Sequence, residues 1–467
     1  MLEKKNKIHR MQIQSNIKHN NQKNISINWK DPDFFSMKNG LKILVIEHTK
    51  LPLVRVSAEL EYIPFLEQEK TGIKNIFGTM LRAGSLHYSK EQLENIVDYL
   101  GIDLYTYFHE SSIFTMKKYL QKSLHILSDI LIHSKFDNYK EFNKIVKQRN
   151  ATIRLSDKEP NCILQKISNL CFYGKNHPYG ESETIDTIKN ITIHDLKKLH
   201  EKYYVPNNFY LSFVGDISKK EAQNLCNEFF SEWKKKIYQY EPIPKFSLNN
   251  KPSQFEVNVI DFPFVNQSYI CIGKPVNLEK SDSDYIPSIL ANGILGEGPQ
   301  SRLFSIIREE KGFTYDIHSS LESDQYIGKF SVITTVGYDV TYEAVKTIIS
   351  EIKKLVDKQV SKEELDIKKK EIIGQFILNL EYPERIQDLF ICELKNNLPS
   401  GFFKNYLNKV ESVTEKDIHR SCKKFFDMKN GRMFILGNMK KILHFIKKLG
   451  YPIRYFDRNG TLLKKEK

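Results

Sequence analysis

The sequence lacks the features of several classes of protein. Its six cysteines are widely spread and never form a Cys-x-x-Cys pair, which argues against a disulfide scaffold or a thiolate zinc site. No apolar run approaches the roughly 18 residues that a membrane-spanning helix needs. The basic start of the chain has a single arginine and no apolar segment behind it, so it resembles neither a secretory signal nor an organellar transit peptide. We therefore expect a cytoplasmic protein without a transmembrane segment.

The chain does have enough apolar material for large cores and an excess of positive charge. It has 467 residues, of which 40% are hydrophobic and 12% aromatic, so wholesale disorder is excluded. At about 100–200 residues per domain, this length predicts more than one domain. The 71 Lys and Arg residues against 57 Asp and Glu give a net charge of +14. Lysine is scattered along the whole chain rather than gathered in a binding motif, so we do not expect nucleic acid as a partner.

Changes in composition predict two domains. Residues 1–34 are polar and read as a disordered lead-in, and residues 235–253 contain three prolines and little periodicity, as a linker does. The first domain is predicted over residues 35–234 and opens on a hairpin around Asn39-Gly40. The second is predicted over residues 254–457, followed by a basic tail at 458–467.

The two domains carry the same sequence pattern. Residues 193–216 (IHDLKKLHEKYYVPNNFYLSFVGD) align without a gap with residues 415–438 (EKDIHRSCKKFFDMKNGRMFILGN), an offset of 415 − 193 = 222. The order of predicted helices and strands also recurs on either side of the linker. We therefore predict an α+β fold of two homologous domains, each a mainly antiparallel sheet with helices packed on one face.

Several strings resemble the M16 (pitrilysin-type) peptidase family, in its compact two-domain branch that includes mitochondrial processing peptidase subunits. They are NGLKILVIEH, HPYGESETIDTIKNIT, YYVPNNFYLSFVGD, and above all NQSYICIG followed by ILGEGPQSRLFSIIREEKGFTY at 266–315. The last string is long and has fixed spacing, which makes it the most specific. The resemblance covers roughly residues 35–457.

The resemblance implies a zinc site that this chain has lost. Family enzymes carry HxxEH on a helix, where two imidazoles four residues apart bind zinc and the glutamate polarises the attacking water. In this sequence the ligand positions fall on Asn75 and Thr79, and the base position falls on Gly78. A further glutamate ligand of the family falls at Thr152. None of the 13 histidines offers a replacement with ligand spacing, so we expect no metal in this chain.

A second motif of the family is intact. An Arg and a Tyr seven residues apart reach from the second domain into the zinc cleft, where they hold the substrate carbonyl and the developing oxyanion. In this sequence they are Arg308 and Tyr315, in IREEKGFTY. Gly312 between them can end the helix in a left-handed conformation. The structural alternative is that Arg308 caps helix carbonyls while Tyr315 packs in the sheet beside Phe313 and Ile317.

These observations favour a non-catalytic subunit of a two-chain M16-type zinc peptidase. A partner chain carrying HxxEH would hold the zinc, and this chain would act in trans through Arg308 and Tyr315 on an unfolded peptide. One alternative is a zinc-less scaffolding subunit with no role in proteolysis. Another is a self-sufficient zinc peptidase, which would need ligands that this sequence does not contain.

Overall fold

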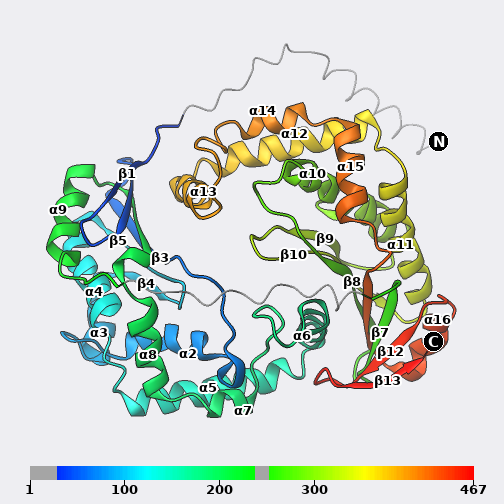
Figure 1. Ribbon diagram of the computed structural model, residues 1–467, viewed down its shortest axis with the longest axis horizontal. Helices are drawn as coiled ribbons and strands as arrows, with labels where there is room; N and C mark the ends of the chain where they lie inside the picture. Colours follow the sequence, from blue (N-terminus) through cyan, green and yellow to red (C-terminus); the bar gives the residue numbers. More distant parts are fainter. Residues whose placement is uncertain (1–28, 237–251, 467) are drawn as a thin grey trace.

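The computed structural model describes residues 29–236 and 252–466. Most of the predicted lead-in and nearly all of the predicted linker lie outside these residues. The described chain forms two halves, which face each other across a central region (Figure 1). In neither described range is any helix long and apolar enough to cross a membrane.

The first half is built on a six-stranded sheet. Its strands, in spatial order, are β1 (Asp33–Ser36), β2 (Lys42–Glu47), β6 (Phe209–Gly215), β3 (Leu53–Leu60), β5 (Glu110–Met116) and β4 (Asp103–Thr106). β2 and β6 pair in parallel, and the other neighbours are antiparallel. The predicted hairpin is present, because β1 pairs with β2 across a turn in which Gly40 has φ +89°.

The second half repeats this plan with a seven-stranded sheet. Its strands, in spatial order, are β13 (Leu462–Glu466), β12 (Ile453–Phe456), β7 (Glu256–Asp261), β11 (Arg432–Gly437), β8 (Gln267–Val276), β10 (Gly328–Gly337) and β9 (Ile317–Glu322). β7 pairs in parallel with both β11 and β12, and the remaining neighbours are antiparallel.

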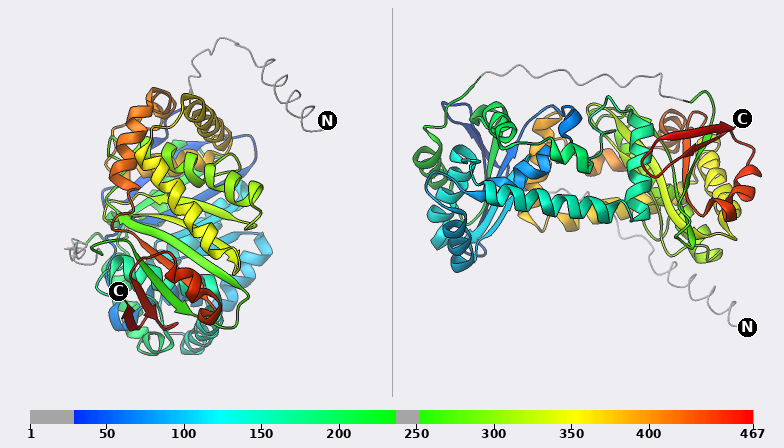
Figure 2. Two further views of the ribbon diagram at one scale, coloured as in Figure 1. Left: turned by 90° about the vertical axis from the view of Figure 1, so that its right-hand side faces the viewer. Right: turned by 90° about the horizontal axis from the view of Figure 1, so that it is seen from below.

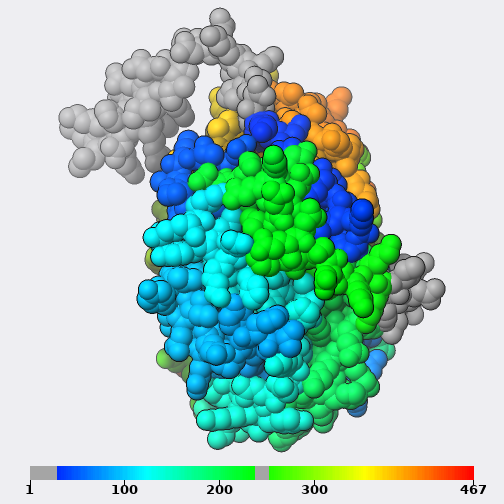
Figure 3. All heavy atoms as spheres, turned by 90° about the vertical axis from the view of Figure 1, so that its left-hand side faces the viewer, coloured from blue at the N-terminus to red at the C-terminus, as the bar shows by residue number. Residues whose placement is uncertain are grey.

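Most of the helices cover the outer faces of the two sheets. The helices of the first half are α2 (Ile73–Met80), α3 (Lys90–Leu100), α4 (Leu120–His133), α5 (Tyr139–Ser156), α6 (Pro160–Tyr173), α7 (Ile185–Lys189), α8 (Ile193–Tyr203) and α9 (Lys219–Phe230). The helices of the second half are α10 (Tyr285–Gly296), α11 (Thr341–Asp357), α12 (Lys362–Asn379), α13 (Pro383–Lys395), α14 (Tyr406–Ser412), α15 (Glu415–Phe425) and α16 (Met439–Lys447). Figure 3 looks onto the outer face of the first half, and the left view of Figure 2 looks onto that of the second.

Strand alternation explains why the outer faces are covered. On β3, Val54, Val56 and Ala58 are buried in the core under the helices, and the alternate residues Arg55 and Glu59 point to the opposite face. The inner face of this sheet is therefore partly polar. Charged side chains of this face therefore lie between the two halves.

The sequence repeat corresponds to a structural repeat. α8 and α15 have the same length, and each begins with a threonine capping box, Thr192 with Asp195 and Thr414 with Asp417. Each helix then leads into the central strand of its sheet, β6 or β11. The predicted α+β fold of two homologous units is confirmed.

Two helices are exchanged between the halves, in the sense that each packs on the sheet of the other half. The sequence did not indicate this arrangement. α6 of the first half packs on β8 and β11 of the second sheet, and α13 of the second half packs on β2 and β6 of the first (Figure 1). The α6 contact buries a large apolar cluster that includes Phe172 and Phe434. The α13 contact is smaller, with Ile391 against Leu44, Ile46 and Val214. Each sheet therefore has helices on one face and a helix of the other half on its inner face.

The structure also differs from the predicted bounds at both ends. β1 begins at Asp33, within the predicted lead-in, because its backbone continues the first sheet by pairing with β2. β13 lies in the segment predicted as a basic tail. Its antiparallel pairing with β12 makes it the edge strand of the second sheet.

Candidate functional site

The predicted zinc-site helix is α2, and α5 packs against it. α2 buries Ile73, Ile76 and Phe77 in the first core, because apolar residues recur at helical spacing. Asn75 and Thr79 lie on its exposed face, four residues apart. Thr152 lies on the exposed face of α5.

The side chains at these positions do not fit a zinc ion. The Asn75 amide donates to Glu183 Oε2 at 3.4 Å. The hydroxyls of Thr79 and Thr152 donate to carbonyls of their own helices, each at 3.1 Å. Zinc sites in proteins use Cys, His and carboxylate ligands, and none of these three residues provides one.

The nearest carboxylate is engaged elsewhere. Glu183 forms a two-point ion pair with the Arg149 guanidinium, one bond of which is 2.8 Å from Nε to Oε2. Because Arg149 already neutralises Glu183, that carboxylate is poorly placed to serve a cation. In the part of the chain that the structure describes, no three His, Cys, Asp or Glu side chains gather closely enough to share a metal ion.

The position predicted for the catalytic base has no side chain that could accept a proton, and it has no space for a larger side chain. A Cβ atom at Gly78 would lie 2.8 Å from Tyr107 Cα and 3.0 Å from the backbone nitrogen of Phe108. Real Cβ atoms do not approach backbone atoms that closely, so α2 packs directly on the turn between β4 and β5. A glutamate at position 78 would require that turn to move. The glycine in the middle of a short helix was the signal for this close approach.

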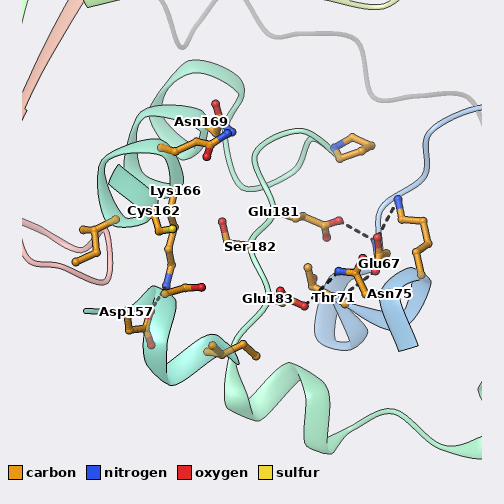
Figure 4. Close-up of a pocket in the computed structure, with 17 residues that line it drawn as sticks. Glu67, Thr71, Asn75, Asp157, Cys162, Lys166, Asn169, Glu181, Ser182 and Glu183 are labelled. Atoms are coloured by element: carbon orange, nitrogen blue, oxygen red, sulfur yellow. Dashed lines mark hydrogen bonds and ion pairs between the residues drawn. The ribbon is translucent and has the colours of Figure 1, made fainter. Parts of the chain in front are cut away.

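Asn75 and Glu183 line a polar cavity of about 380 Å³ between α2, α6 and the 178–183 loop. Figure 4 shows these two residues on one side of the cavity and Cys162 and Lys166 of α6 on the other. The charged groups in the cavity are mostly paired with one another, as Glu67 is with Lys74 at 2.8 Å. Although burial lowers the pKa of Lys74, this carboxylate raises it above the usual value.

The second motif has a defined local geometry. Arg308 lies in the last turn of a π-helix, Phe304–Glu310, and the Gly312 N–H donates to the Arg308 carbonyl at 3.1 Å. Gly312 has φ +63°, so the predicted left-handed helix end is present. The Arg308 guanidinium carbon lies 4.5 Å from the ring centroid of Phe304 and 4.9 Å from that of Tyr315. These two cation–π contacts hold the guanidinium beside both rings.

Tyr315 does not pack in the sheet. It lies two residues before β9, and its side chain is 85% exposed. It lines a cavity of about 560 Å³ between α6 and the inner face of β8, β9 and β10. The structural alternative for Tyr315 is therefore wrong, since this ring contributes no core packing.

α6 lies between the two sites. Gln165 of α6 lines both the cavity that contains Asn75 and the cavity that contains Tyr315. Neither of these two cavities is lined by both Asn75 and Tyr315. The structure thus brings Arg308 and Tyr315 together, and it places them across α6 from the degenerate zinc position.

The loop that follows α6 joins the two halves, a role that sequence reasoning missed. The Tyr179 hydroxyl donates to Asp324 Oδ2 of the second half at 2.9 Å. Burial, together with the Asp324 carboxylate, raises the pKa of Tyr179.

The chain is similar in sequence to several known proteins. The family model described as the Peptidase M16 inactive domain matches residues 190–372. The uncharacterized zinc protease YmxG of Bacillus subtilis is 24% identical over 74% of this chain and 84% of its own length. The probable inactive metalloprotease YmfF of Bacillus subtilis is 22% identical over 65% of this chain and 71% of its own. The non-peptidase homolog YmxG of Helicobacter pylori is 21% identical over 80% and 86%.

Solved structures share the fold. The peptidase M16 inactive domain from Pseudomonas fluorescens superposes with a TM-score of 0.78 at 20% identity, covering 87% of this chain and 98% of that one. A protease from Helicobacter pylori superposes with a TM-score of 0.76 at 22% identity, covering 87% and 99%.

The chain has the two-domain fold of these solved structures, and α2, the helix predicted to match the zinc-binding helix of the family, presents Asn75 and Thr79 rather than zinc ligands. In sequence and fold the chain is similar to the M16 peptidase family, and the relatives that it matches include proteins described as a zinc protease and as a probable inactive metalloprotease.

Proposed function

We propose that this chain is the non-catalytic subunit of a two-chain M16-type zinc peptidase that hydrolyses unfolded peptides. A partner chain with an intact HxxEH motif provides the zinc and the catalytic glutamate. This chain provides Arg308 and Tyr315, which contact the substrate carbonyl from the other side of the assembled site.

The contact between a half-buried Arg308 and an exposed Tyr315 is the observation that supports this proposal. The Arg308 guanidinium lies over the rings of Phe304 and Tyr315, and Tyr315 is exposed, so an N–H donor and an O–H donor lie near each other. Donors fixed in this way stabilise a developing oxyanion more than they stabilise the ground-state carbonyl. A purely scaffolding subunit has no need of an exposed tyrosine beside a stacked guanidinium.

The first expected result concerns metal content. Purified without a partner, the chain should contain well under one zinc per molecule, because Asn75, Thr79 and Thr152 offer no ligand. Elemental analysis after dialysis measures this directly. Firmly bound stoichiometric zinc would contradict the proposal and favour a self-sufficient peptidase.

The second expected result concerns the partner. Affinity purification at native expression level should recover one dominant protein with an HxxEH motif, in near-equal amount to this chain. A specific two-chain interface buries at least ~1,200 Å², so the pair should survive gel filtration. Recovery of nucleic acid that is released by salt would instead support the alternative that the scattered positive charge binds a polyanion. Recovery of a stable assembly without any HxxEH protein would favour the scaffolding role.

A further inference from the structure

The exchange of α13 creates a third cavity, on the inner face of the first sheet. Its volume is about 650 Å³, and it lies between strands β3 and β5 of the first half and the start of α13 of the second. The lining residues are Arg55, Glu59, Glu110, Tyr382, Glu384, Arg385, Gln387 and Asp388. The cavity therefore exists only where the two halves meet.

The charges in this cavity do not balance. Four of its lining residues are carboxylates and two are arginines. Lys395 adds a third cation, since it pairs with Glu59 at 2.8 Å. One of the four carboxylates is therefore left without a cation. The arginine contacts are long, 3.7 Å between Arg55 and Glu110 and 3.3 Å between Arg385 and Asp388.

Two of these carboxylates, Glu110 and Asp388, have raised pKa values. Burial raises the pKa of Glu110 above its usual value, and the Glu59 carboxylate opposite it on β3 raises it further. Burial also raises the pKa of Asp388, with the same Glu59 carboxylate contributing. A cation bound among these groups would favour their charged forms.

The same cavity contains a buried side-chain amide whose oxygen has no hydrogen-bond partner. Gln387 is only 4% exposed, lines the cavity, and donates weakly to Glu59 at 3.5 Å. Its Oε1 atom has no hydrogen-bond partner. A buried acceptor without a donor is costly, and a ligand that carries N–H groups would remove that cost.

We propose that this cavity binds an organic cation, the guanidinium or ammonium group of a basic side chain in the peptide held between the two halves. The inference rests on the proposed function, since it takes an enclosed peptide as the source of the cation. Tyr382 is 61% exposed at the mouth of the cavity, where its ring offers a face for a guanidinium. A single metal ion suits the site less well, because no three carboxylates of the described chain can share one.

The test measures binding to the full-length chain without its partner. The probe is a fluorescent, unstructured peptide with one arginine, compared with the same peptide carrying citrulline, which keeps the shape and removes the charge. We expect the arginine peptide to bind about tenfold to a hundredfold more tightly, as charged hydrogen bonds do relative to neutral ones. Because no turnover is measured, a failure of catalysis in trans would leave this result unaffected.

Matched variants locate the binding. Glu110→Gln and Asp388→Asn keep the shape of the side chains and should each reduce the preference for arginine, and together they should abolish it. Glu363→Gln, at an exposed position in the first turn of α12, should leave the preference unchanged. Circular dichroism checks that each variant is folded.

Two results would overturn the proposal. Equal binding of the arginine and citrulline peptides would exclude a cation site, and so would a preference that persists in the double variant. Agmatine, which is a free guanidinium compound, distinguishes the source of the cation. Weak competition by agmatine supports a peptide-borne group, whereas binding as tight as that of the peptide would contradict it.

Discussion

Replacing Tyr315 by Phe should lower peptide hydrolysis by the proposed two-chain enzyme by about 10²–10³, because it removes the hydroxyl proposed to donate to the oxyanion. The substitution keeps the ring, so the 4.9 Å contact with the Arg308 guanidinium remains. The loss should appear in kcat rather than in KM, since the hydroxyl is proposed to act mainly in the transition state. Hydrolysis of an unstructured peptide at saturating and low concentration separates the two constants.

A matched control is available on the same chain. Tyr99 is 87% exposed, on α3 in the first half, and lines none of the identified cavities. Tyr99→Phe should therefore leave hydrolysis unchanged. Gel filtration confirms that each variant still assembles with the partner. A Tyr315→Phe enzyme within a few-fold of wild type would favour the scaffolding role.

Arg308→Lys extends the same experiment to the second donor. An ammonium group retains the charge but has no planar fork, so it cannot stack between Phe304 and Tyr315 as the guanidinium does. We expect a loss of turnover comparable to that of Tyr315→Phe, again without loss of assembly. Near-normal turnover in both variants would remove the basis of the proposed function.

The repeat and the conformation of the helix ends could be read from the sequence because they depend on local signals. The capping boxes at Thr192 and Thr414 and the left-handed Gly312 are determined by residues within a few positions of each other. The missing zinc ligands were evident from residue type alone. These features do not depend on which segments meet in the folded chain.

The exchanged helices could not be predicted in this way. α6 and α13 have apolar faces that would suit packing on either sheet, and sequence periodicity does not specify which one. The acidic cavity depends on that exchange, because Glu110 and Asp388 are far apart in sequence. The position of Tyr315 outside the strand also depended on where β9 begins, and strand ends are poorly defined by local pattern.

The packing of α6 and α13 on the sheet of the other half predicts how two substitutions change the stability of the protein. Phe172 of α6 is fully buried, and its ring centroid lies 5.1 Å from that of Phe434 on β11. Phe172→Ala should reduce the free energy of unfolding by about 3–5 kcal/mol, because it leaves a large cavity in a well-packed cluster. Ile391→Ala on α13 removes a smaller side chain from a smaller cluster, so its cost should lie nearer the lower end of about 2–5 kcal/mol.

Urea unfolding of the full-length chain, followed by circular dichroism, gives both values. Phe264→Ala provides the control, because Phe264 is 84% exposed in the second half and its removal should cost less than about 1 kcal/mol. If Phe172→Ala were as mild as Phe264→Ala, α6 would not be held to the second sheet by this cluster. If instead Ile391→Ala cost more than Phe172→Ala, α13 rather than α6 would be the main apolar attachment between the halves. The expected order, Phe172 above Ile391, follows from the larger apolar cluster that α6 buries.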